Sequence, residues 1–391
     1  MKIFPSALTA ILLFTVATDG SPNVRTLAES KNKNLIQLGP QNPMQQDQQS
    51  SPITITSSSG NSCNLTGTYK KGTDISSCSS ITIDSLSVPG GVTLDLTRAK
   101  RGAIIEFKGT TTFGTQQWNG PLVMVSGTDL TVKGSGTLDG QGAWYWKQGP
   151  SITRPVFFRL QSVVTSKVSG FTIKNMPYRT FSVVTCKNTV IAGITIDSRA
   201  GNGIAKNTDG FDLSKNDGVT ITGCTIYNQD DCLAMQSSTN TVFSFNYCYG
   251  THGISIGSLG GLAVDASTTV RGLTVEGNTI INSDNGLRIK TISNMKGLIA
   301  DVKYINNKVQ NVRYAIAFHS DYNRAMGRYL GKPNSQVQIT GVTVSGLTGT
   351  AGNLYDIKVN PNVVSNWIFQ AVDVQASVKG TTVGMPNSLN M

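Results

Sequence analysis

Charged residues are scarce in this chain of 391 residues, since Asp, Glu, Lys and Arg together make up 14% of it. This composition excludes a long coiled coil or a disordered acidic tail for the bulk of the chain, because both are rich in charge. The formal net charge is nevertheless +11, and a positive field attracts polyanions such as nucleic acid, anionic lipid or acidic polysaccharide. Dense Lys/Arg runs typical of a nucleic-acid-binding arm are missing, so we expect no nucleic-acid partner.

Long apolar runs are also missing beyond the N-terminus, so we expect no membrane-spanning segment. Residues 1–18 have the pattern of a secretory signal peptide: Lys2 precedes an apolar stretch over residues 3–16, and Ala17 is a small residue suited to cleavage. A buried N-terminal helix or a membrane anchor is the alternative, but the stretch is too short to span a bilayer. We therefore predict a secreted, extracellular protein.

Residues 19–60 are polar, contain a Gln-rich stretch at 41–49 and show no hydrophobic period. This composition predicts a disordered extension or pro-segment. The folded domain is expected to span residues 61–391. Near its start, Asn64-Leu65-Thr66 is a glycosylation acceptor that predicts an exposed loop if it is used.

Six cysteines in an exported chain can form disulfides, although six alone allow about 15 pairings. Two pairs are close in sequence, namely Cys63 with Cys78 and Cys232 with Cys248. A bridge within either pair would close a loop of about fifteen residues and stabilise the fold by roughly 3 kcal/mol. The other two lie in apolar, strand-like runs and are predicted to be buried free thiols: Cys186 and Cys224.

A short phrase of the form Ile-Thr-Gly-apolar-Thr-Ile recurs along the chain. Close copies cover residues 168–173, 191–196, 221–226, 270–275 and 339–344, and looser ones cover 128–132, 242–247 and 299–304. The spacing of roughly 20 to 40 residues is typical of solenoid repeats. Each copy alternates apolar and small polar residues and is rich in β-branched side chains, which predicts a strand.

No amphipathic helical period longer than about two turns separates the copies, so a barrel of alternating strands and helices is excluded. The pattern predicts an all-β fold, a single-stranded parallel β-helix in which each coil stacks on the last and buries a continuous apolar column. A β-sandwich is the alternative, but it would need hairpin turns every 8 to 12 residues and would leave the repeated phrase unexplained.

In a stacked solenoid, the sequence spacing of three polar residues predicts that they lie close together. Asp231 follows Asp209 by 22 residues, and His252 follows Asp231 by 21. Each interval is about one coil, so the three are expected on neighbouring rungs about 4.8 Å apart, with Asp230 beside them. An Asp pair alone is usually a solvated turn and a lone histidine is usually structural, but in register on one solenoid they predict a cleft with carboxylates at its centre.

Two cations follow one longer coil later, in Arg288-Ile289-Lys290, and their i, i+2 spacing puts both on one strand face. Four segments of this chain, in their order and spacing, resemble the four signature segments of the polygalacturonases, glycoside hydrolase family 28. They are Asn207-Thr208-Asp209, Asp230-Asp231, Gly250-Thr251-His252-Gly253 and Arg288-Ile289-Lys290. The likeness runs from about residue 63 almost to the C-terminus and includes residues 134–142 and the Cys232/Cys248 pair.

The resemblance implies a right-handed parallel β-helix that hydrolyses α-1,4 bonds between galacturonic acids with inversion, with no cofactor and no metal. By position in the motif, Asp230 is the proton donor, while Asp209 and Asp231 hold and activate the water. His252 would orient or tune the acid. The chemistry agrees, since inversion needs one protonated carboxyl and one carboxylate, and crowding three Asp raises the pKa of at least one.

Substrate contacts follow from the same likeness. Arg288 and Lys290 would pair with a galacturonate carboxylate. Tyr322 matches a substrate-contacting tyrosine of the family, although a partly buried structural tyrosine would give the same sequence. Asn207 shares a strand face with Asp209 and would line the cleft; Asp212 would line it too, or serve a turn.

One departure from the family bears on activity: Thr251 stands where relatives usually have Gly, and its β-carbon could crowd a sugar or restrict the turn. We favour an endo-acting enzyme, expected to be a monomer, whose partner is the acidic polysaccharide pectin. The alternatives are an exo-acting enzyme, a non-catalytic pectin-binding relative of the same fold, or a pectate lyase, which would need calcium and a base.

Overall fold

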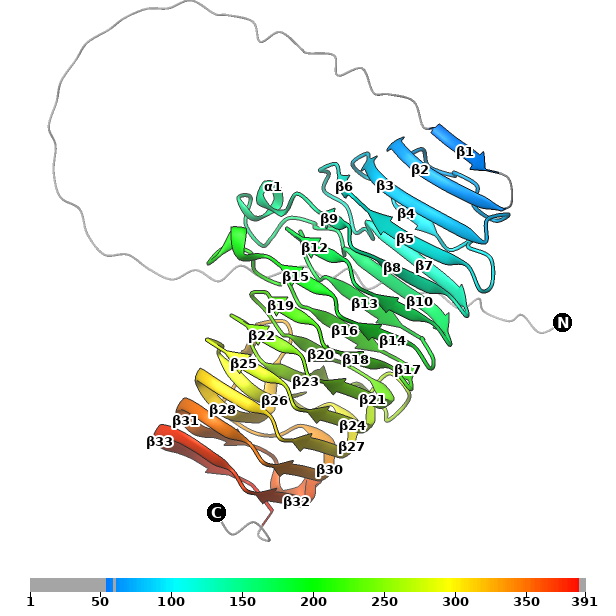
Figure 1. Ribbon diagram of the computed structural model, residues 1–391. Coiled ribbons are helices and arrows are strands. Elements are labelled where there is room, and N and C mark those ends of the chain that lie inside the picture. Colours follow the sequence, from blue (N-terminus) through cyan, green and yellow to red (C-terminus); the bar gives the residue numbers. More distant parts are fainter. Residues whose placement is uncertain (1–53, 59–60, 387–391) are drawn as a thin grey trace, which may run out of the picture. The chain divides into compact units, whose positions relative to one another are not determined.

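The computed structural model describes residues 54–58 and 61–386. The predicted signal peptide (1–18) and most of the predicted extension (19–60) lie outside this part of the chain. Within it, 33 strands form one continuous sheet wound into a right-handed parallel β-helix (Figure 1). The predicted fold class is confirmed. No helix within these residues is long and apolar enough to cross a membrane.

Each coil contributes strands to three faces. Face 1 consists of β4 (Leu94–Leu96), β7 (Val123–Thr128), β10 (Phe158–Val164), β13 (Phe181–Val184), β16 (Phe211–Ser214), β20 (Leu233–Met235), β23 (Ile254–Leu259) and β26 (Asn285–Ile292). This face carries the site described below.

Face 2 consists of β5 (Ile104–Lys108), β8 (Thr131–Gly134), β11 (Lys167–Ser169), β14 (Val190–Ala192), β18 (Thr220–Thr222), β21 (Ser238–Ser244), β24 (Thr269–Glu276), β27 (Lys296–Ile305), β30 (Gln336–Ser345) and β32 (Val364–Gln370), with β17 (Asn216–Asp217) paired to β21. Face 3 consists of β6 (Thr110–Phe113), β9 (Thr137–Asp139), β12 (Thr172–Lys174), β15 (Thr195–Asp197), β19 (Thr225–Tyr227), β22 (Tyr247–Tyr249) and β25 (Thr279–Ile281).

Longer strands join faces at both ends of the solenoid. At the C-terminal end, β28 (Lys308–Asn323) pairs with both β25 and β26, and β31 (Thr348–Lys358) and β33 (Asp373–Val383) stack on it in turn. At the N-terminal end, β2 (Ser62–Thr68) pairs with β3 (Ser80–Val88). The short elements are α1 (Gly142–Trp146), η1 (Arg199–Gly201), η2 (Pro361–Val363) and β29 (Arg328–Tyr329), which pairs antiparallel with the end of β28.

One strand lies upstream of residue 61, where the folded domain was expected to begin. β1 (Thr54–Ser58) pairs antiparallel with β2, from Thr54 opposite Thr66 to Ser58 opposite Ser62. The polar composition of this segment hid the strand, because its alternating Thr, Ile and Ser residues carry little hydrophobic signal. The same pairing places Asn64 within β2, opposite Thr56, and not in the loop that the glycosylation motif suggested.

Three copies of the recurring phrase, at 168–173, 191–196 and 221–226, form a corner between two strands, which corrects the prediction of one strand per copy for them. The copies at 270–275 and 339–344 each lie within one strand, β24 and β30, as predicted. In the copy at 168–173, β11 ends at Ser169 and β12 begins at Thr172, with Gly170 between them at φ 89°. Gly193 and Gly223 hold the same corner in the next copies at φ 61° and 62°. A left-handed backbone is accessible to glycine without a steric cost, so in these three copies the phrase turns the chain from face 2 to face 3.

The core is a set of columns in which like residues stack from coil to coil. Phe158, Phe181 and Phe211 are paired in register on face 1, and successive ring centroids lie 5.2 and 5.0 Å apart. All three are fully buried. Burying each such side chain contributes roughly 2–3 kcal/mol, so these columns hold the coils together.

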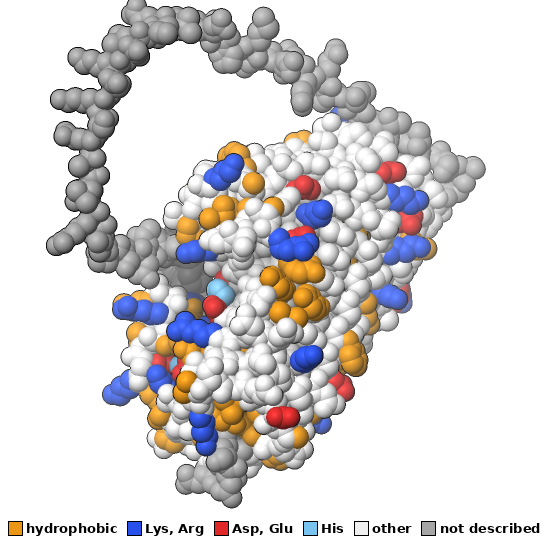
Figure 2. Space-filling model, turned by 60° about the vertical axis from the view of Figure 1, so that its left-hand side comes forward, with side chains coloured by type: hydrophobic (Ala, Val, Ile, Leu, Met, Phe, Trp, Pro, Cys, Tyr) orange, Lys and Arg blue, Asp and Glu red, His pale blue; other side chains and the backbone are white. Residues whose placement is uncertain are grey.

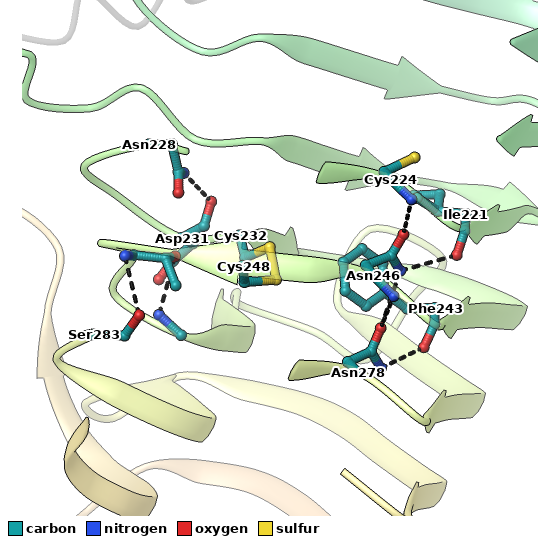
Figure 3. The surroundings of a disulfide bond; sticks show 12 residues. Ile221, Cys224, Asn228, Asp231, Cys232, Phe243, Asn246, Cys248, Asn278 and Ser283 are labelled. Carbon is teal, nitrogen blue, oxygen red and sulfur yellow. Dashed lines mark hydrogen bonds between the residues drawn. A yellow bond between two sulfur atoms is a disulfide. The ribbon is translucent and has the colours of Figure 1, made fainter. Parts of the chain in front are cut away.

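A ladder of paired asparagines runs through the interior. Asn246, Asn278 and Asn307 stack on successive coils. The Asn246 amide donates to the Asn278 side-chain oxygen at 3.1 Å (Figure 3), and the Asn278 amide donates to the Asn307 side-chain oxygen at 3.0 Å. The same oxygens accept backbone N–H groups of the preceding coil. This ladder satisfies backbone donors at the bend, which buried groups require.

The cysteines follow the prediction. Cys63 is bridged to Cys78, and Cys232 to Cys248, the latter directly beside Asp231 (Figure 3). Cys186 and Cys224 are buried free thiols. Burial raises the pKa of the Cys186 thiol to about 11 and that of Cys224 to about 12, so both remain protonated and unreactive.

Candidate active site

The turn between β19 and β20 positions the two adjacent aspartates. The buried amide of Asn228 donates to three backbone oxygens, those of Thr208 (2.9 Å), Asp230 (3.1 Å) and Asp231 (2.9 Å). Figure 3 shows this side chain next to Asp231 and the Cys232–Cys248 bridge. The amide and the disulfide therefore fix the backbone on both sides of the Asp pair.

Neighbouring coils supply the other predicted groups at the same height. The backbone N–H of Gly210 donates to the backbone oxygen of Asp231, and the backbone N–H of His252 donates to the backbone oxygen of Asp230, both at 2.9 Å. Asp209, the Asp pair and His252 thus lie on three successive coils, as their spacing predicted. On this face of the domain, acidic, histidine and basic side chains gather in one area (Figure 2).

Asp231 lies at the bottom of the site, with its side chain 1% exposed. One oxygen accepts hydrogen bonds from the Ser255 hydroxyl (2.7 Å) and from Arg288 (3.2 Å), and the other accepts from Lys290 Nζ at 2.6 Å. Arg288 and Lys290 are themselves only 13% and 10% exposed. Both cations are therefore already engaged inside the free protein, and a sugar carboxylate would have to share them.

Asp230 is held by three donors. Oδ1 accepts from the Asp231 backbone N–H (2.8 Å) and lies 3.1 Å from His252 Nδ1, while Oδ2 accepts from the Asn207 amide at 3.3 Å. Burial acts to raise the pKa of Asp230, but the hydrogen bond and charge of His252, with the charge of Lys290, outweigh it and hold the pKa well below its ordinary value.

His252 bridges the site and its rim. Its Nε2 lies 3.6 Å from Asp284, and its side chain is 40% exposed. Burial acts to lower the pKa of His252, but the hydrogen bond to Asp230 and the charges of Asp230 and Asp231 raise it above 6.5. His252 and Asp230 therefore form an ion pair in the free protein at mildly acidic pH.

Asp209 and Asp212 are the carboxyls of this cluster whose pKa values are raised. Burial, followed by the charges of Asp230 and Asp212, raises the pKa of Asp209 well above its ordinary value. Burial likewise raises the pKa of Asp212 to about 6, although Arg179, 3.5 Å away, opposes the shift. The prediction that crowding raises at least one carboxyl pKa agrees with the structure, but the raised groups are Asp209 and Asp212, not Asp230.

A buried arginine positions Asn207. Arg154 donates to the Asn207 side-chain oxygen at 2.8 Å and to the backbone oxygen of Lys206 at 2.6 Å. Asn207 has φ 59°, a left-handed conformation that asparagine tolerates better than most residues. Its amide is thereby aimed at Asp230, so Asn207 belongs to the cluster. Asn207 and Asp209 lie in the turn before β16 and not on a strand, so the predicted shared strand face is wrong.

Tyr322 lies at the end of the same row of cations, with its ring centroid 5.8 Å from Lys290 Nζ. A second tyrosine from the β28–β29 hairpin, Tyr329, is packed edge-to-face on it at 5.7 Å. The Tyr329 hydroxyl accepts from Arg288 Nε at 3.1 Å. Tyr329 also stacks on the buried His319 at 3.9 Å, which fixes its ring.

Thr251 does not crowd the site. Its side chain is buried, and its hydroxyl donates to the Asp230 backbone oxygen at 2.5 Å and accepts from the Gly253 N–H at 3.2 Å. The concern that its β-carbon would meet a sugar is therefore wrong. The residue instead ties the histidine turn to the aspartate turn.

Three side chains of the site are close enough to be considered as metal ligands, because oxygen and nitrogen atoms of Asp230, Asp231 and His252 lie within 4.8 Å of one another. Arg288 and Lys290 already contact Asp231, and a protonated His252 faces Asp230. A cation placed here would face three positive groups, so this donor set does not fit a metal.

Several members of the site were missed by sequence reasoning. Ser255 lies one coil from Arg288 in register, and Arg179 precedes Asp209 by about one coil, so the repeat spacing could have identified both. Arg154 and Tyr329 come from a loop and a hairpin outside the repeat, and no sequence signal points to them.

The fold and these residues define a class: a parallel β-helix with buried carboxylates of unequal pKa beside cations, which is typical of an acid–base glycoside hydrolase. Residues 78–388 match the sequence profile of Glycosyl hydrolases family 28. The chain is 41% identical to a polygalacturonase of Saccharomyces cerevisiae over 330 residues, covering 82% of this chain and 90% of that protein. It is 38% identical to a probable endopolygalacturonase B of Aspergillus kawachii, covering 84% and 92%.

Solved structures agree. Endopolygalacturonase I from Stereum purpureum superimposes with a TM-score of 0.60 and 27% identity, covering 78% of this chain and 96% of that one. The endo-xylogalacturonan hydrolase from Aspergillus tubingensis gives a TM-score of 0.72 and 25% identity, covering 83% and 97%. This chain belongs to glycoside hydrolase family 28.

Proposed function

We propose that the protein is a secreted endo-polygalacturonase that hydrolyses α-1,4-galacturonosidic bonds of pectin with inversion. The observation that carries the proposal is the cluster of Asp209, Asp230 and Asp231 from adjacent coils, beside Arg288 and Lys290. Carboxyl groups in two protonation states can supply an acid and a base, and the cations suit an acidic sugar. The relatives named endopolygalacturonase support the endo mode.

Asp230 is proposed as the proton donor to the leaving oxygen, by its place in the motif. The pKa of Asp230 is held low in the free protein, so Asp230 must gain a proton when substrate binds. His252 is the protonated neighbour in contact with Asp230, and a shift of its proton to Asp230 would leave both groups neutral. His252 is thus proposed to supply and tune the acid.

Asp209 and Asp231 are proposed to hold and activate the water. The Asp231 carboxylate is fixed by Ser255, Arg288 and Lys290, so its orientation costs no further entropy at the moment of reaction. Tyr322, Asn207 and the two cations would contact the sugar. The tyrosine offers an aromatic face, and the cations share their positive charge between Asp231 and the uronate.

The activity is tested by incubating the protein with polygalacturonate. New reducing ends without absorbance at 235 nm indicate hydrolysis, whereas unsaturated products would indicate a lyase. A ladder of oligomers at early times is expected for endo action; release of monomer alone would indicate exo action. Binding without either product would identify a non-catalytic relative.

The roles of the aspartates are tested with leaving groups of different acidity. Asp230→Asn is expected to abolish hydrolysis of polygalacturonate while leaving the fold and much of the substrate binding. A nitrophenyl oligogalacturonide needs little protonation, so the same variant should retain activity on it, whereas Asp209→Asn should not. Rescue of Asp209→Asn instead would reverse the two roles.

A second substrate is favoured by one observation, the higher TM-score to the endo-xylogalacturonan hydrolase. Xylogalacturonan should therefore be included in the assay beside polygalacturonate. We expect faster hydrolysis of the unbranched polymer because the closer sequence relatives are polygalacturonases. The opposite order would identify the branched polymer as the substrate.

Secretion is proposed from residues 1–18, and the two disulfides fit an oxidising compartment. N-terminal sequencing of the exported protein should show loss of these residues. Use of Asn64 should appear as a mass shift removed by a glycosidase. The protein is proposed to act as a monomer, which size-exclusion chromatography with light scattering would check.

A further inference from the structure

The outer edge of face 3 carries three partly exposed tyrosines next to the catalytic turns. Tyr227 and Tyr249 are paired in register at the ends of β19 and β22, with ring centroids 5.7 Å apart. Tyr247 packs edge-to-face on Tyr227 at 5.9 Å. These three residues are called the tyrosine platform. None belongs to the interior column, since their neighbours Ile226 and Cys248 fill it.

A fixed cation covers one end of the platform. The Arg199 guanidinium lies 3.9 Å from the centre of the Tyr227 ring. Its Nε and Nη2 donate to the two oxygens of Asp197 at 3.0 and 2.7 Å, and its side chain is 59% exposed. Nη1 has no partner among the described residues. Lys174 lies one coil away in register with Asp197, and Asp139 lies one coil beyond Lys174, so the basic and acidic side chains of this row are equal in number.

The platform adjoins the proposed active site from outside. Ser198, Arg199, Asn202, Asn228, Gln229 and Gly250 form a small pocket with two of its tyrosines. Asn228 and Gln229 lead directly into Asp230, and Tyr249 precedes His252 by three residues. The face shown in Figure 2 carries a compact hydrophobic group with Lys/Arg side chains beside it. The same turns thus present the catalytic cluster inward and the platform outward.

We propose that the tyrosine platform and Arg199 bind a second stretch of the acidic polymer, outside the catalytic groups. Aromatic faces suit sugar rings, and an Arg donor held in place suits a uronate carboxylate at low entropic cost. Tyr227 and Tyr249 lie one coil apart, about 4.8 Å, so successive sugars along the solenoid axis meet successive rings. The identity of the polymer rests on the proposed function.

Binding by the platform should depend on the length of the substrate. A polymer that contacts both the platform and the catalytic groups gains a second binding event at high effective concentration. An oligomer short enough to fill only the catalytic groups gains nothing. The platform should therefore affect retention on long galacturonan and leave turnover of a trimer unchanged.

The test compares an Arg199→Ala/Tyr227→Ala double variant with a matched control, Arg271→Ala. Arg271 is a similarly exposed arginine, 52%, that pairs with Asp301 at 2.8 Å, and no aromatic ring from the described part of the chain lies beneath it. Binding to a polygalacturonate gel is measured in an Asp230→Asn background, and kcat/KM on trigalacturonate is measured with Asp230 intact. We expect the double variant to bind the gel about five- to tenfold more weakly and both variants to turn over the trimer normally.

Unchanged gel binding by the double variant would overturn the proposal. An equal loss of trimer turnover would overturn it too, because the ring would then act only by supporting the turn at 228–231. Tyr227→Phe should bind normally, and Arg199→Gln should lose affinity for polygalacturonate but not for fully methyl-esterified pectin. If the unmodified protein hydrolyses no galacturonan, the proposed function fails, whereas the gel assay with the inactive background still reports on the platform.

Discussion

Asp212 should make the protein less stable as the pH rises from 4 to 8. Its carboxyl is buried, its oxygens accept no hydrogen bond within the described part of the chain, and Arg179 is 3.5 Å away. Burial raises the pKa from 3.8 to about 6. Between these values the folded state holds a proton that the unfolded state has lost, so stability falls with rising pH. At 1.36 kcal/mol per pKa unit, the loss is about 3 kcal/mol.

Asp212→Asn removes this titration. Its free energy of unfolding should equal that of the unmodified protein within about 1 kcal/mol at pH 4, where the carboxyl is already neutral, and exceed it by about 3 kcal/mol at pH 8. Urea denaturation at the two pH values and constant salt measures the difference. The exposed carboxylate Asp301 provides a control, because Asp301→Asn should change stability little at either pH. An equal effect of Asp212→Asn at both pH values would refute the reasoning.

Three further outcomes are expected. In calorimetry, Lys290→Ala should weaken binding to polygalacturonate more than binding to a neutral galactan, and equal weakening for both glycans would contradict this. The same variant should destabilise the fold by about 3 kcal/mol because Asp231 loses a buried partner. Thr251→Gly should lower stability by about 1–2 kcal/mol in thermal unfolding through two lost hydrogen bonds, with little change in activity, and a tenfold gain would show crowding after all. Replacing Cys232 and Cys248 together by Ser should cost roughly 3 kcal/mol in urea unfolding, and an unchanged midpoint would show that the bridge adds nothing.

The repeat spacing predicted much of the fold and the site. Intervals of 21 and 22 residues brought Asp209, Asp231 and His252 to one height because each coil advances the chain by one strand spacing. The i, i+2 pair of cations likewise fell on one face. The prediction of one strand over residues 168–173 was wrong because of the glycine in the repeated phrase. Alternation of apolar residues continues through a corner, so periodicity alone did not show that Gly170 bends the chain.

The charge states could not be predicted from the motif. The sequence shows three aspartates, but which one keeps a proton depends on burial and on neighbours from other coils. His252 and Lys290 lower the pKa of Asp230, whereas the charge of Arg179 does not offset the burial of Asp209. Tyr329 and Arg154 escaped prediction for a related reason, since loops between coils have no periodic constraint.

The sequence by itself determined the coil length, the apolar columns and the height at which each catalytic group lies, because a parallel β-helix converts spacing along the chain into stacking in register. Only the tertiary structure decided which side chains contact one another across the coil. It engages Arg288 and Lys290 with Asp231, turns Thr251 inward and leaves Tyr227 and Tyr249 outside. Those outcomes depend on side-chain packing between segments far apart in sequence, where distance and burial set the energies.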